Sequence, residues 1–200
     1  MLTQRLLHIT LFVSVAIVGV LAYLLMDSEG RSRGEAGGSD GILGGEFTLH
    51  SQTGAVTLSD FRGEVVILYF GFLNCPEVCP ASMSTVSNAL KKLDQPELDQ
   101  VQSILVSIDP ARDTLAELAE FSEYFHPNIL GVTGSQDEID AVTADYGAFI
   151  DVVDSTTPGS DYEFRHSSRY YVIDQSGNLV DAMRHSTTPN ELAARIRTLI

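Results

Sequence analysis

The segment Val65–Phe70 reads VVILYF, an unbroken apolar run that ends at Gly71 and leads into two closely spaced cysteines. Such a run is typical of a strand buried on both faces, as in a parallel sheet covered by helices. The cysteines, Cys75 and Cys79, lie between this strand and a helix that apolar spacing predicts over about Pro80–Leu93. We therefore expect both cysteines at the carboxyl end of a central strand, where a helix begins.

Strands and helices alternate along the rest of the chain. A capping box, in which Ser or Thr is followed by Glu three residues later, predicts helix starts at Thr114, Ser135 and Thr188. The remaining predicted strands are Val101–Ile108, Ile129–Thr133, a hairpin of Arg169–Ile173 with Leu179–Met183, and an earlier hairpin of Phe47–Leu49 with Ala55–Leu58.

This order of elements predicts a mostly parallel sheet with an antiparallel edge and helices on both faces. Together with a cysteine motif directly after the first buried strand, it indicates a thioredoxin-like α/β fold. The first hairpin is then an extension at the amino-terminal end of that fold.

The segment Leu6–Met26 contains 21 residues without Asp, Glu, Lys or Arg. A membrane-spanning helix needs about 20 apolar residues, whereas the apolar core of a cleaved signal is shorter. No small-x-small cleavage site follows Met26, so residues 1–26 are predicted to form one uncleaved transmembrane anchor. Residues 27–45 are rich in Gly and Ser and are predicted to be a flexible linker, which leaves 46–200 as the folded domain.

The chain carries 27 acidic and 12 basic residues, for a net charge of −15. Binding to nucleic acid requires clustered Lys and Arg that neutralise phosphates, so we expect no nucleic-acid partner. The same acidity argues against docking of the domain on anionic lipid, and it fits either simple solubility or a basic partner.

The two cysteines are four residues apart, which excludes a multi-disulfide framework. A disulfide between them would close a very small loop and stabilise little, so their role is expected to be chemical. At the start of a helix, both side chains share one face and the helix dipole favours thiolates. A thiolate is both a metal ligand and a nucleophile, so the spacing leaves metal binding and disulfide exchange open.

A third ligand would come from histidine, since thiolate with imidazole favours copper, whereas structural zinc needs four protein ligands. The start of strand Arg169–Ile173 faces the cysteine turn in a thioredoxin-like sheet, and His166 precedes that strand after the polar loop Thr156–Asp161. This position makes His166 a candidate for the third ligand. The other histidines are His8, His50, His126 and His185.

Four motifs occur together in this chain: Leu58-Ser-Asp-Phe-Arg-Gly63, Cys75-Pro-Glu-Val-Cys79-Pro80, Asp109-Pro-Ala-Arg-Asp-Thr114, and His166-Ser ahead of a hairpin strand. In these motifs the chain resembles the Sco/SenC family of copper chaperones and thiol-disulfide proteins that assist cytochrome c oxidase assembly. The resemblance implies that Cys75, Cys79 and His166 bind copper, as Cu(I), Cu(II) or both.

The resemblance also implies a client, the Cu(A) centre of cytochrome c oxidase subunit II, and a location. The domain would face the periplasm from a bacterial inner membrane rather than a mitochondrial one. Other periplasmic copper carriers or thiol reductants are further possible partners.

One departure from the family pattern and one motif bear on function. Family members usually carry an acidic residue before the ligand histidine, but this chain has Arg165, which disfavours extra positive charge at the site; Asp161 or Glu163 are candidates to compensate for it. Within Asp109–Thr114 we expect a helix cap and a turn, either alone or together with a role in partner docking.

The alternative function is an enzymatic one, in which Cys75 and Cys79 reduce the client's cysteines as a thiol-disulfide oxidoreductase. Thioredoxins use CxxC with a cis-proline opposite, whereas this chain has CxxxC and no proline near His166. This difference favours metal binding and leaves the enzymatic role open.

Overall fold

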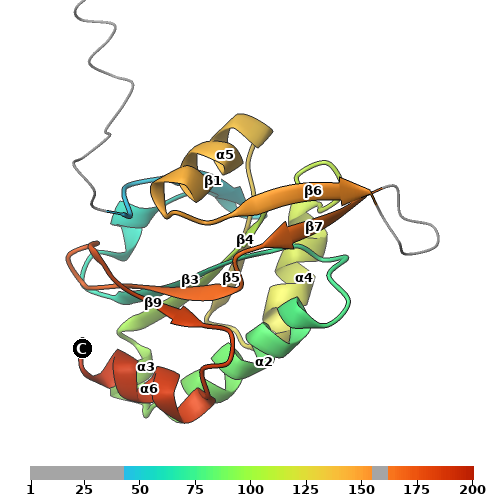
Figure 1. Cartoon of the computed structure of the whole chain (residues 1–200). Coiled ribbons are helices and arrows are strands. Elements are labelled where there is room, and N and C mark those ends of the chain that lie inside the picture. Colours follow the sequence, from blue (N-terminus) through green and yellow to red (C-terminus); the bar gives the residue numbers. More distant parts are fainter. Residues whose placement is uncertain (1–42, 155–161) are drawn as a thin grey trace, which may run out of the picture. The chain divides into compact units, whose positions relative to one another are not determined.

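The computed structural model describes residues 43–154 and 162–200, which form one compact unit from Leu43 onward (Figure 1). The predicted anchor, residues 1–26, and residues 27–42 of the predicted linker lie outside the described residues. Among the described residues, no helix is long and apolar enough to cross a membrane.

A five-stranded mixed sheet, in the order β5-β4-β3-β8-β9, forms the centre of the domain. Strand β3 (Val65–Gly71) runs parallel to β4 (Val101–Ser107), which is parallel to β5 (Ile129–Val132). On its other side, β3 pairs antiparallel with β8 (Arg169–Ile173), and β8 pairs antiparallel with β9 (Leu179–Arg184). Every residue of β3 is buried, which confirms the central strand predicted from its apolar run.

Helices cover both faces of this sheet, as predicted. Helix α2 (Val78–Leu90) packs with α4 (Leu115–Phe125) and α6 (Pro189–Arg197), while α5 (Gln136–Asp145) lies on the other face (Figure 1). The three predicted capping boxes are all formed, because the N-cap hydroxyls of α4, α5 and α6 accept hydrogen bonds from the backbone of the following glutamates.

The amino-terminal hairpin is also present, as β1 (Thr48–Ser51) and β2 (Gly54–Thr57). It is attached next to β5, because the backbones of His50 and Thr133 exchange hydrogen bonds of 2.8 and 2.9 Å. Two short elements were not predicted, the 3-10 turn η1 (Leu58–Phe61) and α3 (Gln95–Leu98). Each has four residues, too few for a helical period to be recognised in the sequence.

A further hairpin, β6 (Ile150–Asp154) with β7 (Tyr162–His166), was missed by the sequence analysis. It forms a separate two-stranded sheet that projects from the domain (Figure 1). The polar segment 156–161, predicted as a loop ahead of His166, lies outside the described residues. His166 does precede β8, as predicted, but it is the last residue of a strand of its own.

Candidate metal centre

The cysteines lie where β3 leads into α2. The helix begins at Val78, so Cys79 is in its first turn and Cys75 is in the preceding turn rather than on the helix itself. The two remain in contact, because the backbone N–H of Cys79 donates a hydrogen bond of 3.3 Å to Cys75 Sγ. Glu77, at the N-cap between them, is exposed and therefore does not place its charge between the sulfurs.

Gly71 gives the Cys79 sulfur the space it occupies. A Cβ at Gly71 would lie 3.0 Å from Cys79 Sγ and 3.1 Å from Tyr69 Cε1, which is closer than side chains normally approach. The glycine that ends the central strand is thus needed for the close approach of the first helical turn.

His166 comes from a different element and completes the group. Its Nε2 lies 3.9 Å from Cys79 Sγ, and one ligand atom from each of Cys75, Cys79 and His166 falls within 4.8 Å of the others. Both cysteines are free thiols and are buried, with exposed fractions of 8% for Cys75 and 1% for Cys79. The three residues predicted as ligands are therefore brought together by the fold.

The other described histidines are not part of this group. His8 lies outside the described residues, while His50 bridges to β5 and the Nδ1 of His126 accepts a hydrogen bond from the Asn128 backbone. His185 faces a pocket of about 250 Å³ that Glu77 and Val78 also line. In the part of the chain that the structure describes, Cys75, Cys79 and His166 are the one group of three suitable side chains.

The two thiols differ in acidity, although the sequence predicted that the helix start would favour both thiolates. Hydrogen bonds from the Cys79 thiol, the Cys79 backbone and His166 lower the pKa of Cys75. The pKa of Cys79 is instead raised, because it donates to the Cys75 thiolate and because it is more deeply buried. Cys75 is therefore the thiolate at neutral pH, and Cys79 keeps its proton until a metal or a reaction removes it.

Aromatic rings hold His166 in place. Its ring packs edge-on against Tyr69 and Phe72, with centroid distances of 6.3 and 5.8 Å. Its buried Nδ1 has no hydrogen-bond partner among the described residues. A ligand histidine usually donates its second N–H to an outer partner. Here the ring is held by packing and by the backbone of β7.

The segment Asp109–Thr114 connects the two parts of the site. Thr114 caps α4 as predicted, but Asp113 does not cap a helix. Its buried carboxylate accepts hydrogen bonds from the backbone N–H of Leu73, at 3.0 Å, and from the Ser107 hydroxyl, at 2.6 Å. Burial raises the pKa of Asp113. Asp113 thereby fixes the loop that leads to Cys75.

The same segment also fixes the hairpin that carries His166. Asp109 is buried and forms an ion pair with Arg112, and it accepts a hydrogen bond of 2.7 Å from the Tyr162 hydroxyl at the start of β7. The Arg112 guanidinium lies 3.9 Å from the centre of the Tyr162 ring and donates to the Tyr162 carbonyl at 3.2 Å. The segment Asp109–Thr114 thus links the cysteine loop to β7, and it is called the brace below.

The positive charge of Arg165 is neutralised by Asp151, a residue that was not considered from the sequence. The Arg165 guanidinium forms an ion pair of 2.6 Å with Asp151, its partner in register across the β6–β7 hairpin. Adjacent strand residues point to opposite faces, so Arg165 and His166 face different sides of the hairpin. Of the two acids considered from the sequence, Asp161 lies outside the described residues.

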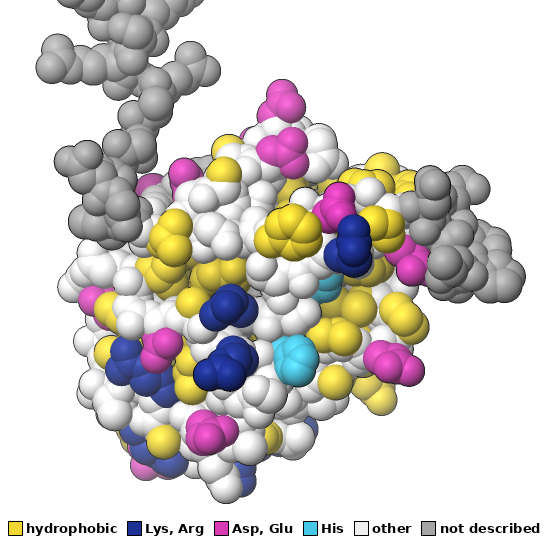
Figure 2. Space-filling view, viewed as in Figure 1, with side chains coloured by type: hydrophobic (Ala, Val, Ile, Leu, Met, Phe, Trp, Pro, Cys, Tyr) yellow, Lys and Arg dark blue, Asp and Glu magenta, His cyan; other side chains and the backbone are white. Residues whose placement is uncertain are grey.

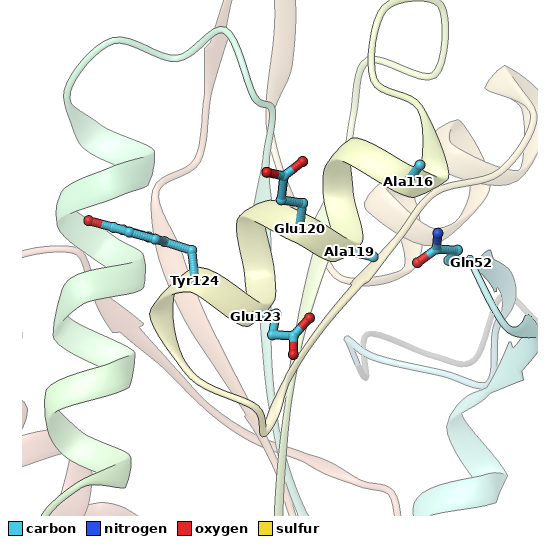
Figure 3. Close-up of a pocket in the computed structure, with 6 residues that line it drawn as sticks. All are labelled: Gln52, Ala116, Ala119, Glu120, Glu123 and Tyr124. Atoms are coloured by element: carbon cyan, nitrogen blue, oxygen red, sulfur yellow. The ribbon is translucent and has the colours of Figure 1, made fainter.

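A separate hollow lies on α4 and carries different chemistry (Figure 3). It is lined by Gln52, Ala116, Ala119, Glu120, Glu123 and Tyr124. These residues include no thiol or imidazole, so the hollow is not a soft-metal site.

The fold and the buried Cys–Cys–His group together define a thioredoxin-like protein whose thiols are placed to hold a soft metal ion. The SCO1/SenC family model matches residues 35–200. This chain belongs to the SCO1/SenC family.

Curated relatives and solved structures agree with this assignment. Mitochondrial SCO2 of Saccharomyces cerevisiae is 32% identical, with 91% of this chain and 62% of that protein covered. Among structures, Bradyrhizobium japonicum ScoI with copper bound has a TM-score of 0.71 and 32% identity, covering 79% and 99% of the two chains. Yeast Sco1 with copper bound has a TM-score of 0.70 and 34% identity, covering 78% and 87%. The predicted thioredoxin-like fold is thereby confirmed.

Proposed function

We propose that this protein is a copper metallochaperone that binds the ion through Cys75, Cys79 and His166. The observation that carries the proposal is the convergence of two sulfurs and one imidazole nitrogen within 4.8 Å. This donor set suits copper and excludes hard cations such as calcium or magnesium. Its similarity to two Sco structures described as having copper bound supports the same cargo.

The protein's own groups are prepared for this ligation in different ways. Cys75 supplies a thiolate already stabilised by the Cys79 backbone N–H. Cys79 gives up its proton when it becomes a ligand, since only the thiolate coordinates a metal. Loading is therefore expected to release about one proton at neutral pH. Burial of both sulfurs limits the access of water to a bound ion.

The proposed client is the Cu(A) centre of cytochrome c oxidase subunit II. A relative of known structure, BsSco, is described as a member of the Sco family of cytochrome c oxidase assembly proteins. Transfer would proceed by ligand exchange, with the client's side chains replacing those of the chaperone one at a time. Periplasmic copper carriers that load the protein are the corresponding upstream partners.

We further propose that residues 1–26 anchor the protein in a bacterial inner membrane and that residues 27–45 tether the domain on the periplasmic side. The apolar segment Leu6–Met26 supports the anchor. The relatives include bacterial SCO2-like proteins from Rickettsia as well as mitochondrial proteins.

A second candidate function is reduction of the client's cysteines. The difference in acidity between the thiols favours it, because Cys75 is the ready nucleophile and Cys79 is next to it. Cys75 would attack a client disulfide and release one client thiolate. Cys79 would then lose its proton and displace the second client sulfur, leaving a Cys75–Cys79 disulfide for a periplasmic thiol reductant to reduce.

Anaerobic copper titration of the reduced full-length chain in detergent distinguishes these functions. We expect one equivalent of tightly bound copper, weakened in His166→Ala and abolished in Cys75→Ser or Cys79→Ser. His50→Ala is the matched control, since it removes an exposed imidazole outside the site and should bind copper as the wild type does. Absence of copper binding together with intact disulfide reductase turnover would contradict the chaperone.

A further inference from the structure

Two arginines of the domain have no carboxylate partner among the described residues. Seven arginines lie in the described ranges, and five of them form ion pairs. The two exceptions are Arg169 and Arg184, and both are exposed. In a chain with 27 acidic and 12 basic residues, uncompensated positive charge needs an explanation.

These two arginines, called here the arginine pair, lie directly opposite each other. Arg169 of β8 is in register with Arg184 of β9. Like charges in this position repel each other and destabilise the strand pairing. The Arg169 guanidinium donates a hydrogen bond of 3.2 Å to the Ala182 carbonyl. This bond orders the Arg169 side chain but does not neutralise its charge. Positive charge on an exposed edge strand discourages aggregation, but Arg169 lies on the inner strand β8.

The arginine pair is close in the chain to residues of the metal centre and to a residue of the adjoining pocket. Arg169 follows His166 by three residues, and Arg184 precedes His185. His185 lines the same pocket as Glu77 and Val78, the two residues before Cys79. Figure 2 shows basic side chains beside a histidine on a face that also displays hydrophobic side chains.

Two exposed apolar side chains belong to segments that adjoin the metal centre. Val78 is 38% exposed and Phe149 is 59% exposed. Phe149 is held beside the ligand strand, because its backbone N–H donates to Ser167 Oγ at 2.9 Å. Apolar groups next to positive charge form a surface suited to another protein, with carboxylates opposite the arginines.

We propose that Arg169 and Arg184 dock an acidic surface of the protein that receives the metal ion. This inference rests on the proposed chaperone function and names the chemistry of its partner. Opposite charge at this place would orient the client so that its ligands reach Cys75 and Cys79. A protein is favoured over an anionic membrane, because the net charge of −15 repels anionic lipid and the apolar groups need a shaped partner.

The test uses full-length protein in phosphatidylcholine nanodiscs and the apo Cu(A) domain of a bacterial cytochrome c oxidase subunit II as the probe. Binding is measured with the reduced, metal-free protein, and transfer is measured with the copper-loaded protein. In the double variant Arg169→Glu/Arg184→Glu, binding and the second-order transfer rate should both fall at least about tenfold at low ionic strength. The difference should largely disappear at about 0.5 M NaCl.

Lys91→Glu/Lys92→Glu is the matched control. It makes the same charge change at two lysines that have no ion pair among the described residues and lie at the far end of α2 from Cys79. Its binding and transfer should be close to wild type. An equal loss in the control would indicate that net charge alone matters and would overturn the inference.

A stability measurement separates docking from a structural role. Arg184→Glu places opposite charges across the strands, so its melting temperature should rise while client binding falls. A lowered melting temperature with unchanged binding would show a purely structural pair and overturn the inference.

The remaining outcomes are also distinct. Wild-type binding that depends on the arginines, without copper transfer, would contradict the proposed function and leave the docking surface standing. Transfer that is equal in wild type and the arginine variants would overturn the docking surface and leave the function standing. A last outcome is that phosphatidylglycerol vesicles capture the nanodiscs only when the arginines are present, while the Cu(A) domain does not bind. The surface would then bind lipid, and this result would also overturn the inference.

Discussion

The two cysteines, although only four residues apart, have different environments. Cys75 receives hydrogen bonds in the turn before α2, while Cys79 donates one from a deeper position. A pKa lowered in the folded state means that the Cys75 thiolate persists to lower pH than in an ordinary thiol. Reactivity should therefore be selective for one sulfur.

We predict that iodoacetamide at about pH 6 labels Cys75 ahead of Cys79 in the reduced, metal-free protein. Cys79→Ala removes the thiol donor, so the pH at which Cys75 reaches half of its maximal rate should move upward. Mass spectrometry of labelled peptides over a pH series measures both. Cys75→Ser is the control and should react slowly throughout. Preferential labelling of Cys79 would show that the assignment is reversed.

Gly71 is the second residue whose identity the site requires. In Gly71→Ala, the new methyl group would lie 3.0 Å from Cys79 Sγ, so the sulfur or the helix must move. We expect a lower melting temperature and copper affinity reduced by about tenfold or more. Gly45→Ala is the control, because its methyl group would meet Asp145 only at an ordinary 3.8 Å. Equal copper affinity in both variants would contradict the prediction.

At the scale of elements, the site depends on the brace between the cysteine loop and β7. Asp113 holds Leu73, and Asp109 holds Tyr162, so one loop after β4 positions both kinds of ligand. Among the described residues, the hydrogen bonds of Asp109 and Asp113 do not include one to either sulfur. Their effect on the metal centre is therefore one of positioning.

Tyr162→Phe tests the brace. The ring over Arg112 is kept, while the hydrogen bond from the hydroxyl to Asp109 is lost. We predict that copper affinity falls about tenfold, as for other outer-shell changes, and that stability falls by about 1 kcal/mol. Tyr124→Phe, at an exposed position on α4, is the control and should change neither. Copper titration and thermal unfolding provide the measurements, and unchanged affinity in Tyr162→Phe would count against the brace.

The elements that could be predicted are those with a strong local signal. The run Val65–Phe70 and the capping boxes at Thr114, Ser135 and Thr188 were confirmed because burial and capping depend on residues close in sequence. The β6–β7 hairpin was missed because each strand has only five residues and those of β7 are largely half-exposed. The roles of Asp113 and Asp151 could not be predicted, since their partners are 40 and 14 residues away.

The ligand set was predicted partly from the residues and partly from the family resemblance. The spacing of Cys75 and Cys79 indicated reactive thiols but did not show that their acidities differ. His166 could not be chosen from spacing alone, because it lies 87 residues from Cys79 and reaches it through a hairpin that was not predicted. Sequence patterns record neighbours along the chain, whereas a metal centre joins residues that are distant in it.

At the scale of the whole molecule, the proposed anchor determines where the domain acts. The described residues contain no membrane-spanning helix, and the proposed anchor is in residues 1–26. We predict that the full chain sediments with membranes and resists carbonate extraction, whereas a chain lacking residues 1–26 is released. Fractionation with immunoblotting checks this result. A full chain recovered in the soluble fraction would contradict the proposed anchor.

The three proposed ligands come from two segments of the backbone. Cys75 and Cys79 lie on either side of the start of α2, and His166 ends strand β7 of the β6–β7 hairpin. A movement of that hairpin would leave two sulfurs on the ion, a linear arrangement that satisfies Cu(I) but not Cu(II). His166→Ala should accordingly weaken Cu(II) much more than Cu(I). With copper bound as proposed, retention of Cu(II) would depend on the position of the hairpin far more than retention of Cu(I) would.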